Sequence, residues 1–341
     1  MATLTPILWK TGQLSLLDQR LLPQQQAWVH CTNARQVAEA ITTMVVRGAP
    51  AIGIAAAFGM ALAAAFGEDL QQAHQRLAAS RPTAVNLFWA LARCQQLIEQ
   101  NAEQNKASPT LATALEDLAI AIHHEDQQLC AAVAQHGADH IGECSAVYTH
   151  CNTGALATGG VGTALGIIHA LVQRHKVERI FAGETRPWLQ GARLTAYELT
   201  QMGAPFELVC DSAAAHTMAN RSVDWLIVGA DRITANGDTA NKIGTHQLAI
   251  VAKALGVKVM VAAPSTSIDL SLATGAEIEI EQRAADEIRT LQGNVIAPEG
   301  CPVFNPAFDV TPASMIDAIV TEKGVISPVS SKTLAQQLKT S

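Results

Sequence analysis

The sequence predicts an α/β protein in which a mostly helical region precedes a region of alternating strands and helices. Up to about residue 136, apolar residues recur mainly at helical spacing, whereas from residue 145 short apolar runs alternate with helical segments. The chain has 341 residues, enough for two domains. We therefore expect a small helical domain with a β element over residues 1–130 and a parallel, doubly wound sheet over 131–341.

The composition narrows the possible functions. Hydrophobic residues make up 49% of the chain and aromatic residues 4%, so the core is expected to consist of Ala, Leu, Val and Ile. The net charge of −7 leaves no broad basic field and argues against a nucleic-acid partner. The first residues lack the pattern of a signal peptide, and the apolar runs are too interrupted or too rich in alanine to span a membrane.

Cysteine and histidine usage favours neither disulfides nor metal. The seven cysteines are odd in number and none has CxxC spacing, so we expect a reducing, cytoplasmic environment. His136 and His140 are four residues apart but lack the glutamate of a zinc-protease helix. We therefore expect no metal site.

The first region contains a succession of expected elements. Short strands or a hairpin occupy residues 1–30, a helix follows from 33 to 46, and an alanine-rich helix extends to about 65. Residues 68–136 are expected to be helical, with a break at Ser80-Arg81-Pro82-Thr83, a polar loop over 101–109 and a helix over 111–133.

Arg47-Gly48-Ala49 precedes the alanine-rich helix. These residues are either a simple helix break or an anion site. In the second case glycine admits close backbone N–H groups, the helix N-terminus favours negative charge, and arginine binds in a bidentate fashion.

The second region has a regular strand–helix rhythm. Strands are expected over residues 145–149, 178–182, 205–210, 223–228 and 258–262. Four polar loops follow such strands and should meet at one edge of the sheet: 150–154, 184–191, 229–242 and 263–267. The glycines at 159–162 do not form GxGxxG, and no acidic residue is placed to read a ribose, so we expect no nicotinamide cofactor.

Residues 225–246 carry the most informative loop. Asp231 and Arg232 follow a buried apolar strand, a turn comes at Asn236-Gly237-Asp238, and Asn241 and Lys242 precede a helix that begins near Thr245. A carboxylate, amides and an ammonium group in one loop suit a small polar substrate. A structural turn with a surface ion pair is the alternative reading.

Cys151 also lies directly after a strand. A small buried thiol of no chemical role is the common case. Its position at a strand end favours a functional thiol instead, since a nearby cation or helix N-terminus can lower the pKa of cysteine.

Several motifs together resemble the 5-methylthioribose-1-phosphate isomerase family. They are RGAPAIG at 47–53, SRPTAVNLFWALAR at 80–93, HCNTGALAT at 150–158, ETRPWLQGARLTAYEL at 184–199 and GADRITANGDTANKIGT at 229–245. The resemblance extends from near Trp9 to near Pro328 and includes LDQRLLP and PAFDVTPASMIDAIVTEKGVI. That family is related to the regulatory subunits of a eukaryotic translation initiation exchange factor and to ribose-1,5-bisphosphate isomerases.

The resemblance implies a fold and an activity. It implies a small helical N-terminal domain, a Rossmann-like C-terminal catalytic domain, usually a homodimer, and no metal or organic cofactor. It also implies conversion of an aldose 1-phosphate to a ketose 1-phosphate in methionine salvage. By their motifs, Asp231 and Cys151 match the catalytic pair. The substrate-binding set matches Arg47, Gly48, Ala49, Arg81, Gln190, Asn241 and Lys242.

The implied chemistry fits these residue types. A phosphate on C1 blocks the anomeric hydroxyl, so an acid must protonate the ring oxygen before hydrogen moves from C2 to C1. To be protonated near neutral pH, Asp231 needs a raised pKa, which burial beside Ile227, Val228 and Ala230 can supply. Cys151 is expected to act as a base or to stabilise developing charge at C2.

Three questions stay open at this point. The sequence does not distinguish proton abstraction from a hydride shift. It does not show how the methylthio group is held, for which Phe88 or Trp89 are candidates, although core packing explains them as well. Two other functions also remain: a non-catalytic regulatory subunit, which is expected to lack the cysteine or the aspartate, and an isomerase of ribose 1,5-bisphosphate, which needs a second phosphate site.

Overall fold

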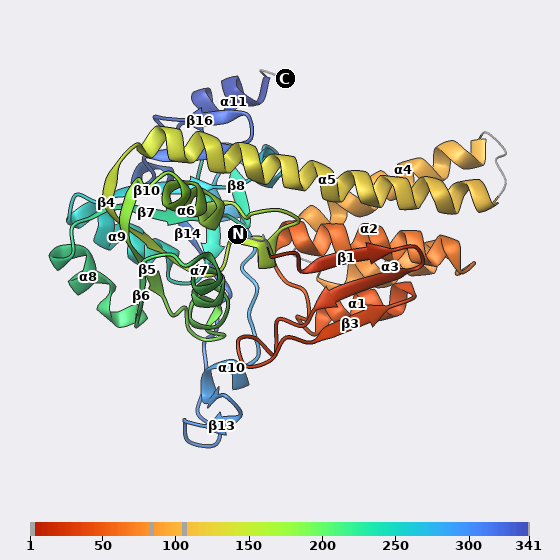
Figure 1. Cartoon of the computed structure of the whole chain (residues 1–341), viewed down its shortest axis with the longest axis horizontal. Helices are drawn as coiled ribbons and strands as arrows, with labels where there is room; N and C mark the ends of the chain where they lie inside the picture. Colours follow the sequence, from red (N-terminus) through yellow and green to blue (C-terminus); the bar gives the residue numbers. More distant parts are fainter. Residues whose placement is uncertain (1–3, 82–84, 104–107, 340–341) are drawn as a thin grey trace. The chain divides into compact units, whose positions relative to one another are not determined.

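The computed structural model describes residues 4–81, 85–103 and 108–339, which form two compact units (Figure 1). The N-terminal unit consists of Met1–Ala131 and Thr153–Gly162, and the C-terminal unit of Ala132–Asn152 and Thr163–Ser341. Residues 153–162 thus belong to the N-terminal unit, although the residues before and after them in the chain belong to the C-terminal unit.

The N-terminal unit combines a small antiparallel sheet with helices, as the sequence predicts. The sheet has the order β1-β2-β3, with β1 at Ile7–Lys10, β2 at Gln13–Leu17 and β3 at Trp28–Cys31. The helices are α1 (Ala34–Thr42), α2 (Ala49–Ala65), α3 (Leu70–Ser80), α4 (Val85–Glu103) and α5 (Ser108–Ile141). The break predicted after Ser80 falls partly on Pro82 and Thr83, which lie outside the described residues, as does the middle of the predicted loop at 101–109.

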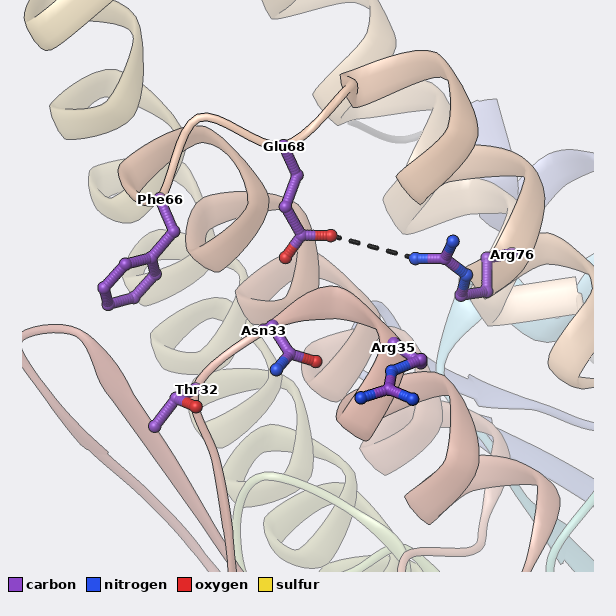
Figure 2. Close-up of a pocket in the computed structure, with 6 residues that line it drawn as sticks. All are labelled: Thr32, Asn33, Arg35, Phe66, Glu68 and Arg76. Atoms are coloured by element: carbon purple, nitrogen blue, oxygen red, sulfur yellow. Dashed lines mark ion pairs between the residues drawn. The ribbon is translucent and has the colours of Figure 1, made fainter.

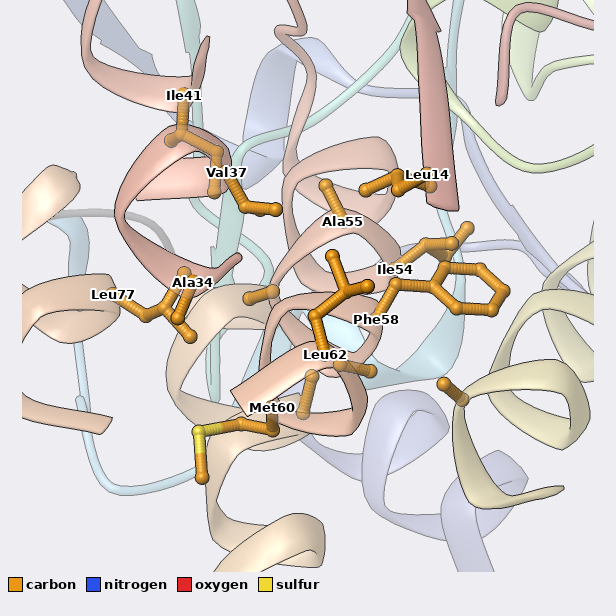
Figure 3. Packing of buried hydrophobic residues seen from close by; sticks show 14 of the residues in the cluster. Leu14, Ala34, Val37, Ile41, Ile54, Ala55, Phe58, Met60, Leu62 and Leu77 are labelled. Carbon is orange, nitrogen blue, oxygen red and sulfur yellow. The ribbon is translucent and has the colours of Figure 1, made fainter. Parts of the chain in front are cut away.

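Helix α2 is the centre of the N-terminal core. It is apolar on all sides, and every residue from Ala51 to Ala63 is buried. A helix of this kind is stable only when other elements surround it. Figure 3 shows Ile54, Phe58 and Leu62 of α2 among side chains from β2, α1 and α3. Its small residues allow close approach, since a Cβ on Gly59 would lie 3.1 Å from both methyl groups of Leu77.

The C-terminal unit is built on a seven-stranded sheet with the order β16-β15-β10-β7-β4-β5-β6. All neighbouring pairs are parallel except β15 with β16. The strands are β4 (Cys144–Thr149), β5 (Val177–Gly183), β6 (Phe206–Val209), β7 (Val223–Val228), β10 (Lys258–Ala262), β15 (Ala318–Thr321) and β16 (Gly324–Ile326). The five predicted strands therefore exist and form adjacent members of one sheet.

Helices cover both faces of this sheet. Alternate residues of β7 point to opposite faces, because Trp225 and Ile227 belong to one buried cluster and Leu226 and Val228 to the other. The first face packs against the end of α5, α6 (Ala164–Gln173) and α7 (Ala196–Met202). The second packs against α8 (Ala214–Asn220), α9 (Thr245–Ala254) and α11 (Ser331–Lys339). Two-sided burial explains why the strands read as continuous apolar runs.

The predicted polar loop at 229–242 is more ordered than expected. It contains two short strands, β8 (Arg232–Thr234) and β9 (Thr239–Lys242), joined by the predicted turn, in which Gly237 has φ of 93°. They belong to a second sheet of order β11-β8-β9-β14, with β11 at Ile268–Asp269 and β14 at Phe308–Thr311. A further hairpin of β12 (Thr290–Leu291) and β13 (Asn294–Val295) follows the short helix α10 (Asp286–Arg289).

Helix α5 is also longer than the predicted helix over 111–133. Its last part packs closely against α6 at Gly137, where a Cβ would lie 2.2 Å from Cδ1 of Ile167. Over the described ranges, no helix is both long enough and apolar enough to cross a bilayer.

Candidate active site

Two strands at the middle of the large sheet place the two predicted catalytic residues. Strands β4 and β7 are parallel neighbours, and Thr149 at the end of β4 lies beside Ile227 of β7. Cys151 follows β4 by two residues and Asp231 follows β7 by three. Because these neighbouring strands are parallel, Cys151 and Asp231 follow the same edge of the sheet.

Cys151 is buried and conformationally constrained. It is 6% exposed and has φ of 63°, a left-handed conformation that few non-glycine residues adopt. Its N–H donates to Oγ1 of Thr185 at 2.9 Å, and its carbonyl accepts from Oγ1 of Thr195 at 2.5 Å. The thiol is therefore attached to a backbone that is held on both sides.

Gln190 lies at the start of a π-helical turn, Gly191–Thr195, that leads into α7. The turn is pressed against the end of β5, since a Cβ on Gly191 would lie 1.7 Å from the carbonyl oxygen of Gly183. Gln190 is 7% exposed, and its Oε1 is buried without a hydrogen-bond partner among the described residues. An acceptor of this kind is costly unless a ligand or water satisfies it.

Asp231 and Asn241 are neighbours across the β8–β9 hairpin. Arg232 pairs with Ala240, and the N–H of Asp231 donates to the Ala240 carbonyl at 2.9 Å. Asp231 is half-buried, which is less than the full burial expected for it. Asn241 is 3% exposed and donates through Nδ2 to Oγ1 of Thr245 at 3.0 Å.

Lys242 is fixed by the antiparallel pairing of β9 with β14. It lies beside Phe308, and its Nζ donates to the carbonyl of Ala307 at 2.9 Å and lies 4.8 Å from the centre of the Phe308 ring. The ammonium group is thus held against β14.

His150 contacts both the segment after β5 and the segment after β9. It is 3% exposed, and its Nε2 donates to the carbonyl of Ile243, next to Lys242, at 2.8 Å. A carbonyl only accepts, so Nε2 carries the proton. Burial lowers the pKa of His150 and favours the neutral ring, in which Nδ1 carries no proton and lies 3.4 Å from Oγ1 of Thr185.

A cavity of about 230 Å³ lies beside His150 and contains neither Cys151 nor Asp231. Its walls include the carboxylates of Asp211 and Asp309. Asp211 accepts from the N–H groups of Thr185 and Arg186, and Asp309 from those of Gly244 and His246. Burial raises the pKa of Asp309. Two carboxylates already occupied by backbone donors make this cavity a poor place for a phosphate.

In the N-terminal unit, the backbone of Gly48 lies so close to that of Ala157 that only glycine fits there. It has φ of 93°, and a Cβ there would lie 2.5 Å from the carbonyl oxygen of Ala157. Gly48 is also the N-terminal cap of α2, so Arg47 and Ala49 flank the positive end of that helix. Both flanking residues are half-buried.

Arg81 lies at the end of α3, a few residues before α4 begins. Helices α2 and α4 cross closely where a Cβ on Gly53 would lie 2.7 Å from the carbonyl oxygen of Asn86. The two helix starts, each preceded by a predicted arginine, therefore belong to the same part of the N-terminal unit.

A second hollow of about 510 Å³ in the N-terminal unit also contains arginines, Arg35 and Arg76 (Figure 2). Glu68 lines the same hollow; it pairs with Arg76 at 3.8 Å and accepts from the N–H of Ala34 at 3.1 Å. Because Glu68 and the capping residue Asn33 already satisfy the start of α1, this hollow does not favour an anion.

The two spaced histidines have structural partners. His136 bonds the carbonyl of Thr321 at 3.0 Å through Nδ1, and the ring of His140 meets that of Trp225 edge-on. Within the part of the chain that the structure describes, no group of three or more His, Cys, Asp or Glu side chains is arranged to hold a metal ion. All seven cysteines are free thiols.

Five of the predicted site residues belong to the C-terminal unit: Cys151, Gln190, Asp231, Asn241 and Lys242. The remaining four, Arg47, Gly48, Ala49 and Arg81, lie in the N-terminal unit. Sequence reasoning gave no role to His150, Thr185 or Thr195, although all three stand within the motifs. A polar residue in a loop directly after a buried strand draws attention to His150 and Thr185, whereas Thr195 lies in the π-helical turn and has no such signal.

These features define the class of protein. A model of the initiation factor 2 subunit family matches residues 45–328, and the chain belongs to this family. Within it, the chain is similar to the methylthioribose-1-phosphate isomerase of Pseudomonas fluorescens (strain Pf0-1), with 54% identity over 340 residues, covering 96% of this chain and 94% of the relative.

Solved structures give the same picture. The crystal structure of 5-methylthioribose 1-phosphate isomerase from Pyrococcus horikoshii OT3 matches 99% of this chain and 96% of its own, with a TM-score of 0.93 and 39% identity. That of translation initiation factor eIF-2B, subunit delta, from A. fulgidus covers 99% of this chain and all of its own, with a TM-score of 0.86 and 36% identity.

Proposed function

We propose that this chain is an aldose–ketose isomerase that converts 5-methylthioribose 1-phosphate to 5-methylthioribulose 1-phosphate in methionine salvage. The observation that carries the proposal is the placement of Cys151 and Asp231 at the ends of adjacent parallel strands, in a chain 54% identical to a methylthioribose-1-phosphate isomerase. Both residues match the family's catalytic pair, which is not expected of a purely regulatory relative.

We also propose that residues 131–341 are a Rossmann-like catalytic domain and residues 1–130 a separate helical domain. Counted along the chain, the six parallel strands have the spatial order 3-2-1-4-5-6, which is the order of doubly wound dinucleotide-binding folds. In such sheets ligands bind where the order reverses, here between β4 and β7. Cys151 and Asp231 follow these two strands.

Asp231 is proposed as the general acid. Its protonated carboxyl gives a proton to the ring oxygen, the bond from that oxygen to C1 breaks, and C1 becomes an electron-poor centre. Hydrogen then moves from C2 to C1, the C2 hydroxyl loses its proton to the Asp231 carboxylate, and C2 becomes the ketone carbon. The acid is thereby restored, and the atoms of substrate and product balance.

Cys151 is proposed to act at C2. In one route its thiolate removes the C2 hydrogen as a proton, an enediolate-like species forms, and the resulting thiol returns a proton to C1. In the other, hydrogen passes from C2 to C1 as hydride and the sulfur stabilises the developing charge. The burial of Cys151 favours a water-poor site in both cases.

The other predicted site residues are proposed as substrate-binding groups. Gln190, Asn241 and Lys242 are proposed to bind the sugar phosphate at the strand ends, and the unsatisfied Oε1 of Gln190 is suited to accept from a sugar hydroxyl. Arg47, Gly48, Ala49 and Arg81 are proposed to supply phosphate donors, with the N-terminus of α2 adding backbone N–H groups.

The remaining expectations complete the proposal. The enzyme is proposed to work in the cytoplasm as a homodimer, without a metal or organic cofactor. The direct test of the activity is incubation of the purified chain with 5-methylthioribose 1-phosphate, followed by phosphorus NMR. A ketose 1-phosphate signal that forms with the wild type and not with Asp231→Asn is expected; no ketose from the folded wild type would overturn the proposal.

A further inference from the structure

Cys151 and Thr185 share an unusual backbone conformation. Both have positive φ, 63° and 65°, and Thr185 is β-branched, which makes this conformation especially unfavourable. Such residues persist only where the surroundings hold them, and they concentrate at functional sites. The contacts that hold Cys151 are therefore of interest beyond the fold.

Two threonine hydroxyls form hydrogen bonds with the N–H and the carbonyl of Cys151. Oγ1 of Thr185 accepts from its N–H at 2.9 Å, and Oγ1 of Thr195 donates to its carbonyl at 2.5 Å. Thr185 is 0% exposed and Thr195 2% exposed. We call this pair of contacts the threonine clamp.

The threonine clamp is itself supported. The N–H of Thr185 donates to Oδ1 of Asp211 at 2.8 Å, and its hydroxyl, which already accepts from Cys151, donates to the Gly183 carbonyl at 3.1 Å. On the other side, Nδ2 of Asn152 donates to Oγ1 of Thr195 at 3.3 Å and to Oε1 of Glu198 at 2.7 Å. Neither hydroxyl can rotate away without breaking a second bond.

Thr195 also belongs to the π-helical turn that begins after Gln190. One short segment therefore carries the buried amide of Gln190 at its start and the hydroxyl that holds Cys151 at its end. Turns of this type are frequent at functional sites. A substrate that binds Gln190 would act on the segment that also fixes the thiol.

We propose that Thr185 and Thr195 are positioning residues that hold the Cys151 thiol in its working place, with Thr195 linking that position to Gln190. This inference rests on the proposed role of Cys151 in catalysis. Neither hydroxyl is assigned a contact with substrate. Loss of either should move the thiol rather than remove a reacting group, and displacements of about 1 Å cost up to roughly 100-fold in rate.

The test uses Thr185→Val and Thr195→Val, which remove the hydroxyl at nearly constant shape, with Thr185→Ser and Thr195→Ser as rescue variants. Thr200→Val is the matched control, because its hydroxyl bonds only the Ala196 carbonyl of its own helix at an exposed position. For each full-length protein, kcat and KM are measured. The alkylation rate of Cys151 by iodoacetamide is followed against pH by peptide mass spectrometry.

We expect each valine variant to lose about 10-fold or more in kcat with KM changed less than about 3-fold, and each serine variant to stay within about 3-fold of wild type. The alkylation profile of Cys151 should change in the valine variants and not in Thr200→Val. If a valine variant does not fold, Thr185→Ala or Thr195→Ala removes the same hydroxyl with a smaller side chain.

Wild-type kcat together with an unchanged alkylation profile, in a folded valine or alanine variant, would overturn the proposal. The experiments distinguish failure of the catalytic role of Cys151 from failure of the positioning role of the two threonines. Full activity of Cys151→Ser removes Cys151 from the chemistry, and the alkylation profile still reports whether the threonines position the thiol. An inactive Cys151→Ser, together with valine variants that keep both the wild-type kcat and the wild-type alkylation profile, overturns the threonine clamp alone.

Discussion

The N–H of Cys151 donates to Oγ1 of Thr185 at 2.9 Å, and both residues adopt a left-handed backbone conformation. Such a conformation costs about 1–3 kcal/mol for each non-glycine residue. The structure therefore holds strain at the end of β4, directly beside the end of β7 from which Asp231 emerges. This is the position at which the proposed chemistry takes place.

Asp231→Asn tests the general acid. Asparagine keeps the size and the backbone bond to Ala240 but has no carboxylic proton to give. We expect kcat to fall by at least ~100-fold with substrate binding largely kept. Steady-state kinetics and calorimetric titration with a product analogue measure the two quantities. A near-normal kcat in the folded variant removes Asp231 from this role.

Arg47→Ala and Arg81→Ala test the phosphate donors. Each loss of a charge-assisted hydrogen bond should weaken binding by about 1.5–3 kcal/mol. Affinity for a phosphorylated product analogue is the measurement. Arg35→Ala and Arg76→Ala, in the hollow shown in Figure 2, are matched controls in the same unit and should bind normally. Equal affinity in all four variants would contradict the assignment.

Cys151→Ser tests the thiol. Serine is close in size, so the fold should be kept, but its hydroxyl is a far weaker base than a thiolate, so most activity should be lost. Circular dichroism and kcat are measured on the same preparation. Full activity of the serine variant would show that the sulfur is not needed.

Substrate deuterated at C2 reports the route of hydrogen. A hydride shift keeps the label at C1 of the product, whereas proton abstraction allows exchange with solvent. We expect little exchange, because Cys151 is 6% exposed and a dry site slows exchange in either route. Proton NMR of the product measures retention, and extensive washout would exclude a hydride shift as the main path.

Asp126 predicts a specific dependence of stability on pH. It is 7% exposed, accepts from the N–H of Gly159 at 2.6 Å, and burial raises its pKa to about 6 from 3.8. The folded chain therefore binds more protons than the unfolded chain between about pH 4 and 6. The contribution of Asp126 to stability is present below pH 4 and lost as the pH rises towards 6.

Asp126→Asn keeps an acceptor for Gly159 and removes the charge. Relative to wild type, it should gain up to about 3 kcal/mol of unfolding free energy between pH 4 and 7. Urea unfolding at both pH values measures the difference. Asp286→Asn, with a side chain that is 81% exposed, is the control and should show no such trend. A pH-independent difference for Asp126→Asn would contradict the prediction.

Much of the sheet, and the position of the candidate residues that follow its strands, can be predicted from local sequence. The strands that end before Cys151 and Asp231 are continuous apolar runs, because helices bury them on both faces, and such runs are visible in the sequence. Polar residues placed directly after them were therefore correctly expected at one edge. The turn at Gly237 could also be predicted locally, because Asn236-Gly237-Asp238 are turn-forming residues.

The parts that were missed depend on distant partners. Strand β9, Thr239–Lys242, is polar and shows no alternation, and it is ordered by pairing with Phe308–Thr311 some seventy residues later in the chain. The last part of α5 packs at Gly137 against Ile167 of α6. The roles of Thr185 and Thr195 depend on contacts with Cys151 that no local pattern encodes.

The most direct test of the central claim is a comparison of two substrates with the purified wild-type chain. Turnover of 5-methylthioribose 1-phosphate and of ribose 1,5-bisphosphate is measured side by side as kcat/KM for ketose formation. The account predicts ready isomerisation of the methylthio sugar and little or no turnover of the bisphosphate. A preference for the bisphosphate, or no turnover of either sugar, would contradict it.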